Sequence, residues 1–345
     1  MRLGVLLLVV AAACAPAATR PAGSPAATAS LRAAATATPT INVDDMMGGS
    51  FVPATVFTLA GSEIHAVKLQ NHFTPFRIPV SGKAHAVVSL DGARLYVLDR
   101  KDGSTRIRAL DAATGAEIGS TTLAEEPADG LAIAQDRIDR VLVLVKAGSG
   151  VRVEEIATSP LAVRGGISKA ECGDRLLASQ SRIAIVCASA SKIAIDTLVG
   201  QTARVEVPGG PIVASAMLAD GGLVVGTTAG TLHRVKRGDL ALIDGPELPN
   251  GATVPEAIVA SDEQRFAVFA RTASGATVST YDARSGVLNG GPFAVTTRVH
   301  HAVALWPFAY FAGPDPGLWH VDLRSGLVER MAALTDPVPL AVSAR

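Results

Sequence analysis

Short apolar runs alternate with polar turns along most of this chain. From about residue 55 to the end, runs of Val, Ile, Leu and Ala are separated by clusters of Gly, Ser and Asp. Runs of about four to eight such residues between turns are typical of β-strands, whereas helices need longer segments with a period near 3.6. No convincing amphipathic segment of three helical turns occurs. The pattern therefore predicts an all-β fold.

The turns recur with a constant period. A Gly- and Ser-rich series runs from Gly61 to Asp315, which is 254 residues in six intervals of about 42 each. A second series has turns at Asp91, Asp136, Ser181, Asp220, Asp262 and Pro307. The third has an Asp followed four residues later by a Gly, at Asp111–Gly115, Asp196–Gly200, Asp282–Gly286 and Asp322–Gly326. Three series that share one period indicate an internal repeat.

The residue types in these turns suit hairpins. An Asp that opens a turn accepts backbone N–H bonds, and a later Gly takes the left-handed conformation that hairpin loops of about three to five residues require. Three turns that join four strands within about 42 residues form one blade of a β-propeller. The seven turns of the first series therefore predict a seven-bladed β-propeller of four-stranded antiparallel blades.

The two ends of the repeat region complement each other. Residues 55–80 contain three expected strands, Val56–Leu59, Ile64–Leu69 and Phe76–Val80, but no innermost strand. The C-terminal segment Val338–Ser343 looks like an innermost strand without a blade. We therefore expect the C-terminal strand to complete the first blade and close the ring, which removes exposed strand edges.

One blade resembles a known repeat family. Ser89–Val97 (SLDGARLYV), followed by Ala109–Gly115 (ALDAATG), is similar to the repeat of YVTN-type propellers, which are bacterial relatives of WD-repeat domains. The similarity is partial at 260–286 and 321–326, and elsewhere it consists of the period and the turn residues. The resemblance implies a seven-bladed propeller in an exported bacterial protein. It implies no single activity, because such propellers serve as binding platforms, enzymes and assembly components.

The first fifty residues have a different composition. Met1 and Arg2 precede an apolar stretch, Leu3–Val10, and then three alanines. This order is typical of a secretory signal peptide, to which we assign residues 1–13. Residues 14–50 are rich in Ala, Thr and Pro and are expected to form a disordered tether. Residues 51–345 are then the propeller.

Cys14 follows the three alanines directly. The arrangement resembles a bacterial lipoprotein lipobox, in which the Cys is lipidated and becomes the first residue of the mature chain, although Ala11 stands where that motif prefers Leu. The alternative is ordinary cleavage nearby, which leaves a soluble exported protein. We expect an exported protein at the cell envelope, lipid-anchored to the membrane outer surface or periplasmic, with membrane contact only through the anchor.

The charge balance excludes one class of partner. The 31 basic and 31 acidic residues give no net charge. Binding to nucleic-acid phosphates needs a basic surface, so no nucleic-acid partner is expected. The chain is 48% hydrophobic, which is too apolar for a chain that is disordered throughout.

Two cysteines remain after processing, and both fall in one blade. If Ser179 faces Arg182 in a hairpin, Asp174 faces Cys187, and Cys172 lies one pair further out. In an oxidising compartment a structural disulfide between Cys172 and Cys187 is expected. Two Cys without a nearby His are only half of a metal site, and no Cys-x-x-Cys-His haem motif occurs, so we expect neither a metal site nor a cofactor.

Alignment of the blades on the turns between their first and second strands places a ring of polar residues at the mouth of the central channel. The ligand-binding candidates are His85, Asp129, Arg175, Glu256, His300 and His301. Imidazole and carboxylate groups from different blades could form a small-ligand or metal site there. The alternative is a hydrated rim without a ligand, because neighbouring inner strands diverge.

A second candidate region is aromatic. Trp306 and Phe308 occupy a turn where other blades have Asp-Gly. Exposed aromatic side chains there would form a contact with a protein or a glycan. The alternative is packing between blades, because strands of a propeller are buried on both faces.

The catalytic motifs of common enzyme classes are absent. The chain has no Gly-x-Ser-x-Gly elbow, His-Glu-x-x-His, Walker A loop or dinucleotide fingerprint. We therefore expect a binding or scaffolding module whose partner is an envelope protein or a small ligand. The alternative is a propeller enzyme, lactonase-like or quinoprotein-like, with its site at the channel mouth. A third possibility is an assembly component that docks another envelope protein.

Overall fold

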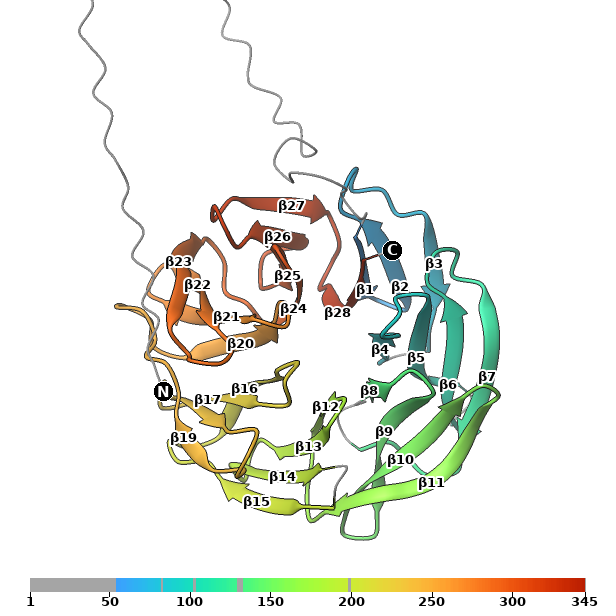
Figure 1. Ribbon diagram of the computed structural model, residues 1–345. Helices are drawn as coiled ribbons and strands as arrows, with labels where there is room; N and C mark the ends of the chain where they lie inside the picture. The colour runs from blue at the N-terminus through green and yellow to red at the C-terminus, as the bar shows by residue number, and fades with distance from the viewer. Residues whose placement is uncertain (1–53, 82, 102–103, 129–132, 198–199, 345) are drawn as a thin grey trace, which may run out of the picture. The chain divides into compact units, whose positions relative to one another are not determined.

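The computed structural model describes residues 54–344 apart from 82, 102–103, 129–132 and 198–199. The predicted signal peptide (1–13), Cys14 and the tether (14–50) lie outside these residues. Within the described part there is no α-helix, and hence no helix long and apolar enough to cross a membrane. The described strands form seven four-stranded antiparallel sheets around a central axis (Figure 1). This is the predicted seven-bladed β-propeller.

In each blade the four strands follow one another from the centre of the ring outward. Blade 1 consists of β28 (Val338–Ser343), β1 (Thr55–Ala60), β2 (Glu63–Lys68) and β3 (Phe76–Pro79), and blade 2 of β4 (His85–Val88), β5 (Arg94–Lys101), β6 (Ser104–Asp111) and β7 (Glu117–Leu123). Blade 3 consists of β8 (Ile133–Arg137), β9 (Arg140–Ala147), β10 (Gly150–Thr158) and β11 (Leu161–Ala170), and blade 4 of β12 (Arg175–Ser179), β13 (Arg182–Cys187), β14 (Lys192–Thr197) and β15 (Thr202–Glu206). Blade 5 consists of β16 (Ile212–Met217), β17 (Leu223–Thr227), β18 (Leu232–Val235) and β19 (Leu242–Asp244). Blade 6 consists of β20 (Pro255–Ala260), β21 (Arg265–Thr272), β22 (Gly275–Asp282) and β23 (Leu288–Val295), and blade 7 of β24 (His301–Leu305), β25 (Phe308–Ala312), β26 (Leu318–Asp322) and β27 (Val328–Ala332).

The C-terminal strand closes the ring. β28 pairs antiparallel with β1, so that Ser343 lies opposite Thr55 and Val338 lies opposite Leu59. The hydroxyl of Ser343 also donates a hydrogen bond to the carbonyl of Gly92 in blade 2, at 3.1 Å. The predicted closure of the first blade by residues 338–343 is confirmed.

The core is divided into seven clusters, each between two neighbouring blades. Between blades 1 and 2, for example, Phe57 and Leu95 are fully buried in one cluster. Between blades 6 and 7 the rings of Phe269 and Phe311 lie 5.5 Å apart in another. Both faces of most blades are therefore covered, which explains why second strands such as β9 and β13 are buried along most of their length.

The predicted Asp…Gly turns join the third and fourth strands of their blades. In blade 2, Oδ1 of Asp111 accepts hydrogen bonds from the backbone N–H groups of Ala113 and Thr114, and Gly115 has φ 74°. A Cβ on Gly115 would lie 2.4 Å from the ring of Phe76 in blade 1. The Gly is thus required by its conformation and also by contact with the neighbouring blade.

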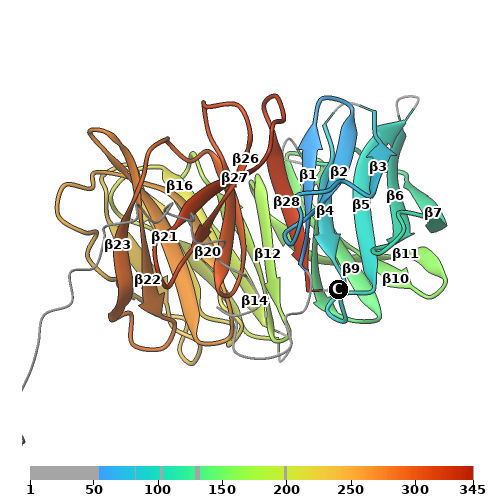
Figure 2. The same cartoon turned by 90° about the horizontal axis from the view of Figure 1, so that it is seen from above.

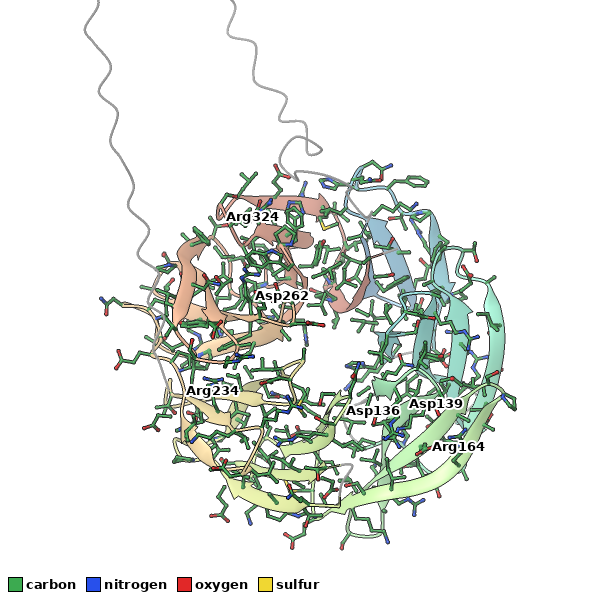
Figure 3. The ribbon with its side chains drawn as sticks, viewed as in Figure 1. Asp136, Asp139, Arg164, Arg234, Asp262 and Arg324 are labelled. Carbon is green, nitrogen blue, oxygen red and sulfur yellow. A yellow bond between two sulfur atoms is a disulfide. The ribbon has the colours of Figure 1, made fainter. Side chains whose placement is uncertain are left out.

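One turn of the second series lies elsewhere than predicted. Asp136 belongs to β8, and the turn falls at Ile138 and Asp139 (Figure 3). Asp136 is fully buried, and its carboxylate binds the guanidinium of Arg140, whose Nη1 also donates to Glu155 at 2.8 Å. The side chain of Asp136 is engaged in this buried ion pair and therefore does not cap the turn.

Cys172 and Cys187 form a disulfide in blade 4 with a Cα–Cα distance of 5.5 Å. Ser179 pairs with Arg182 and Arg175 with Val186, which is the hairpin register predicted from the sequence. The bond joins the segment before β12 to the end of β13.

Candidate functional site

The turns divide the propeller into two faces (Figure 2). The hairpins between first and second strands and between third and fourth strands lie on one face, which we call the hairpin face. The hairpins between second and third strands, and the segments that lead into the innermost strands, lie on the other. We call this second face the cavity face, because a cavity of about 700 Å³ opens among the innermost strands there. This volume is within the range of small-molecule sites, about 300–1,000 Å³.

All seven blades contribute to the cavity wall. Five of the six ligand-binding candidates lie on it, namely His85, Arg175, Glu256, His300 and His301. Asp129, the sixth, lies outside the described residues. The structure therefore brings together side chains from blades 2, 4, 6 and 7 that are as much as 216 residues apart in the sequence.

Glu256 is engaged in structural contacts. Its side chain is only 5% exposed. Oε1 accepts hydrogen bonds from Nε of Arg271 at 3.0 Å and from Nε of Arg298 at 2.7 Å, and Oε2 accepts one from the backbone N–H of Val299 at 2.8 Å. Arg298 and Val299 lie in the segment that leads from blade 6 into blade 7. Glu256 therefore fixes this junction and has little capacity left for a ligand.

Arg175 differs from Glu256 because its hydrogen-bond donors have no acceptors among the described residues. Its half-buried guanidinium makes no hydrogen bond within the described part of the chain. The nearest carboxylate is that of Asp174, whose Oδ1 lies 3.9 Å from Nε of Arg175. Burial lowers the pKa of Arg175, and Asp174 opposes this effect. A partly desolvated cation without an acceptor is a strong candidate for binding an anion.

Two histidines of the cavity wall, His85 and His301, have pKa values lowered by burial and by neighbouring groups. Burial lowers the pKa of His85 to about 4, the backbone of Ala86 opposes the shift, and the charge of His301 adds to it. Burial also lowers the pKa of His301, with further contributions from His300 and Arg175. Both imidazoles are therefore neutral at pH 7.

Three further polar residues of the cavity wall were not among the candidates predicted from the sequence. Lys83 lies two residues before His85, Asp174 directly precedes Arg175, and Ser215 lies in β16. The hydroxyl of Ser215 is buried and has no hydrogen-bond partner among the described residues, and the same holds for Oδ1 of Asp174. Lys83 and Asp174 lie beside the aligned ring residues in the sequence, and this position could have indicated them. No sequence pattern indicates Ser215.

The charged residues that line the cavity balance among the described residues. Lys83 and Arg175 are basic, and Asp174 and Glu256 are acidic. The charge of Glu256 is compensated by Arg271 and Arg298, which do not line the cavity. In the same part of the chain, no group of three or more His, Cys, Asp or Glu side chains could hold a metal ion.

The aromatic turn packs between blades. Phe308 is buried in the cluster between blades 7 and 1, where its ring centroid lies 5.5 Å from that of His320. Trp306 is half-buried, and the guanidinium carbon of Arg265 in blade 6 lies 4.2 Å from its ring centroid. The expectation of an exposed interaction patch is therefore wrong for Phe308. For Trp306 the contacts match the alternative, packing between neighbouring blades.

Comparison with known proteins identifies the fold. No model of a known protein family matches the chain, and no curated protein is similar to it in sequence. Among solved structures, the periplasmic gluconolactonase of Pseudomonas aeruginosa has a TM-score of 0.62 and 17% identity, over 84% of this chain and 98% of that one. A functionally unknown protein from Desulfotomaculum acetoxidans has a TM-score of 0.61 and 10% identity, over 84% and 99%.

The WD40 repeats of RRP9 have a TM-score of 0.55 and 12% identity, over 84% of this chain and 94% of that one. At these identities the likeness concerns the fold alone. The chain is a seven-bladed β-propeller of the kind found in WD40 proteins and in the gluconolactonase.

Proposed function

We propose that this protein is an extracytoplasmic binding module of the cell envelope that takes a small organic anion into its central cavity. The observation that carries the proposal is Arg175, a half-buried guanidinium on the cavity wall without a hydrogen-bond acceptor among the described residues. A carboxylate or phosphate would supply that acceptor in bidentate geometry. Lys83 would add a second positive charge.

The chemistry of the remaining wall is consistent with an organic anion. Leu177, Ile258 and Leu340 give the cavity an apolar surface, which suits the carbon skeleton of a ligand. The hydroxyl of Ser215 and the neutral imidazoles of His85 and His301 offer hydrogen bonds of the kind that fix the orientation of polar substituents. These groups favour a carboxylate that carries hydroxyl groups over a plain inorganic ion.

The envelope location rests on the leader sequence and on the disulfide. Residues 1–13 have the order of a signal peptide, and Cys14 stands at the position of a lipidated cysteine. The Cys172–Cys187 bond belongs in an oxidising compartment. In this proposal the tether holds a propeller with YVTN-type repeats at the membrane surface, where it acts as a binding platform.

Calorimetric titration tests the ligand class. The mature chain is titrated with gluconate, malate and inorganic phosphate, and with glucose as an uncharged comparison. We expect at least one anion to bind with measurable heat and glucose not to bind. Absence of binding for all three anions contradicts the proposal.

Two arginine variants test the site. Arg175→Gln removes the charge from the cavity wall, and we expect it to weaken anion binding at least tenfold. Arg137→Gln is the matched control, because Arg137 is exposed at the end of β8 on the hairpin face. Equal affinities of the wild type and the Arg175→Gln variant would place the bound anion elsewhere.

A second candidate function is hydrolysis of a lactone. It is favoured by the neutral imidazole of His85, which could accept a proton from water in the cavity, and the fold is shared with a periplasmic gluconolactonase. An assay of δ-gluconolactone hydrolysis, in which the released protons are measured, tests this second function. Enzymatic turnover that is lost in His85→Gln supports this function, and a rate equal to the spontaneous rate excludes it for this substrate.

The anchor has its own test. Mass spectrometry of the protein purified from membranes should show a mature chain that begins at a lipid-modified Cys14. An unmodified chain that begins elsewhere contradicts the lipid anchor and leaves the cavity proposal unaffected.

A further inference from the structure

The exposed large apolar side chains are concentrated on one face of the propeller. Nine such side chains occur among the described residues. Seven of them lie in, or within two residues of, the turns of the hairpin face and are 44–64% exposed: Phe73, Leu90, Ile118, Ile138, Val287, Leu288 and Leu327. The other two, Val163 and Ile167, belong to the outer strand β11. None of the nine lies on the cavity face.

The seven side chains follow an arc of consecutive blades. Val287 and Leu288 belong to blade 6, Leu327 to blade 7 and Phe73 to blade 1. Blade 2 carries Leu90 and Ile118, and blade 3 carries Ile138. Within the described residues, blades 4 and 5 contribute none. Blade 1 is therefore the middle of the arc, as the order of the blades in Figure 1 shows.

The chain enters the propeller in the middle of the same arc. β1 begins at Thr55, which pairs with Lys68 at the end of β2 and with Ser343 at the end of β28. These strand ends belong to the hairpin face. Directly before β1, the carbonyl of Ala54 accepts a hydrogen bond from the N–H of Leu69, at 3.0 Å, in the turn that carries Phe73. Ala54, the first described residue, therefore lies at this face, and Cys14 precedes it by 40 residues in the sequence.

Basic side chains accompany several of the apolar ones. Arg137 is adjacent to Ile138 and is exposed. Arg284 precedes Val287 by three residues, and Arg324 precedes Leu327 by three, in two turns of the same kind (Figure 3 labels Arg324). The guanidinium of Arg324 also binds the carboxylate of Asp322, with Nη2 2.8 Å from Oδ2. Apolar side chains flanked by arginines suit the boundary between acyl chains and phosphate headgroups.

We propose that the hairpin face rests on a lipid bilayer and inserts the seven apolar side chains into its interfacial layer. The proposal goes beyond the anion-binding function, uses the envelope location proposed above, and replaces the expectation that only the anchor contacts the membrane. The seven apolar side chains lie on six hairpins, with Val287 and Leu288 adjacent on one of them. Polar residues separate the hairpins, which suits shallow insertion better than a continuous protein interface. Each contributes little alone, but seven on one face act together, so that the face binds a bilayer without the lipid anchor.

This orientation has a direct result for the cavity. The cavity face is opposite the hairpin face, so the site of Arg175 and His301 points away from the bilayer into the aqueous compartment. A soluble anion could then reach the cavity without crossing the protein or the membrane.

Cosedimentation with vesicles tests the proposal. The protein is the mature chain of residues 14–345 with Cys14→Ser, so that no lipid anchor contributes. The vesicles contain phosphatidylcholine and phosphatidylglycerol in a ratio of about four to one. The test variant is Leu90→Ser/Ile138→Ser/Leu327→Ser, and the control variant is Val163→Ser/Ile167→Ser, which removes exposed apolar side chains from β11.

We expect the wild type and the control to bind the vesicles and the triple variant to bind at least tenfold more weakly. Loss of binding in both variants, or in neither, overturns the proposal, as does a wild type that stays in solution. If the wild type forms a dimer without vesicles and the triple substitution abolishes that dimer, the hairpin face binds a second copy of the chain. This outcome also overturns the proposal. Unchanged thermal unfolding shows that the variants are folded.

Anion titration of the triple variant separates this proposal from the proposed function. The three substitutions lie on the face opposite the cavity, so anion affinity should equal that of the wild type. Vesicle binding that fails while anions still bind contradicts membrane docking alone. Anion binding that fails while vesicles still bind contradicts the cavity function alone.

Discussion

Glu256 and Arg175 occupy corresponding positions at the starts of innermost strands, yet they differ in what surrounds them. Two guanidinium groups and a backbone N–H satisfy Glu256, whereas the guanidinium of Arg175 has only a carboxylate 3.9 Å from its Nε among the described residues. A charge whose partners are inside the protein holds the structure together. A charge without such partners is available to a ligand.

Glu256→Gln tests the structural role of this carboxylate. The amide keeps the shape but leaves two guanidinium groups without a negative partner, and we expect the free energy of unfolding to fall by about 2 kcal/mol. Urea denaturation measures the difference. Glu126→Gln is the control, because Glu126 is largely exposed in its pair with Lys146 and should change stability by less than about 0.5 kcal/mol.

His85 makes the stability of the propeller dependent on pH. Its pKa is about 4 in the folded protein and near 6.5 in an unfolded chain. Between these values the unfolded chain binds a proton that the folded protein does not, so the free energy of unfolding decreases as the pH falls through this window. At pH 5 the loss from this residue amounts to at most about 2 kcal/mol.

The measurement compares urea denaturation of the wild type and of His85→Gln at pH 7.5 and pH 5. Glutamine does not titrate, so the variant should lose less stability between the two pH values. Equal losses in both proteins would show that His85 titrates normally.

At the scale of elements, the recurring turns join blades as well as strands. Gly326 has φ 76°, and a Cβ there would lie 2.4 Å from the ring of Phe293 in blade 6. Gly61 has φ 60°, but nothing lies within 4 Å of the position of its Cβ. The two glycines share a backbone conformation and differ in their contact with a neighbouring blade.

Gly326→Ala should therefore destabilise the protein more than Gly61→Ala. We expect about 1 kcal/mol for Gly61→Ala, from the backbone alone, and about 2–3 kcal/mol for Gly326→Ala, because Phe293 must move as well. Differential scanning calorimetry measures both variants. Equal shifts in Tm would show that the contact between blades does not depend on this Gly.

At the scale of the whole molecule, one strand pairing holds the ring closed. Removal of residues 338–345 leaves β1 with an unpaired edge at the centre of the propeller and opens the clusters on both sides of blade 1. We expect this truncated chain to aggregate, because an exposed strand edge is a template for pairing with other chains. Light scattering after refolding measures the aggregation of the truncated chain. Removal of residues 344–345 alone, which follow β28, should leave a soluble monomer.

The sequence predicted those parts of the fold that depend on local chemistry. Turn residues such as Asp111 and Gly115 fix hairpins wherever they occur, so their period determined the number of blades and the strand at Val338. The register at Ser179 likewise predicted that Cys172 and Cys187 would be close. Alignment of blades on these turns then placed most of the candidate residues on the cavity wall.

Properties that depend on contacts between blades could not be predicted in the same way. The partners of Glu256 and the burial of Phe308 become visible only once the blades are packed together. Asp is a common turn residue, but Asp136 is fully buried in β8, where its carboxylate accepts a hydrogen bond from Arg140. The hydroxyl of Ser215 has no sequence signal, because its position in the cavity is set by the curvature of the ring.

The pairing of β28 with β1 has a consequence for biosynthesis. β28 leaves the ribosome after every other described strand, so the circle cannot be completed on a nascent chain. A product that terminates before Val338 lacks the closing strand and exposes a hydrophobic edge of the kind that proteases and chaperones recognise. Completion of the circle therefore depends on translation through β28.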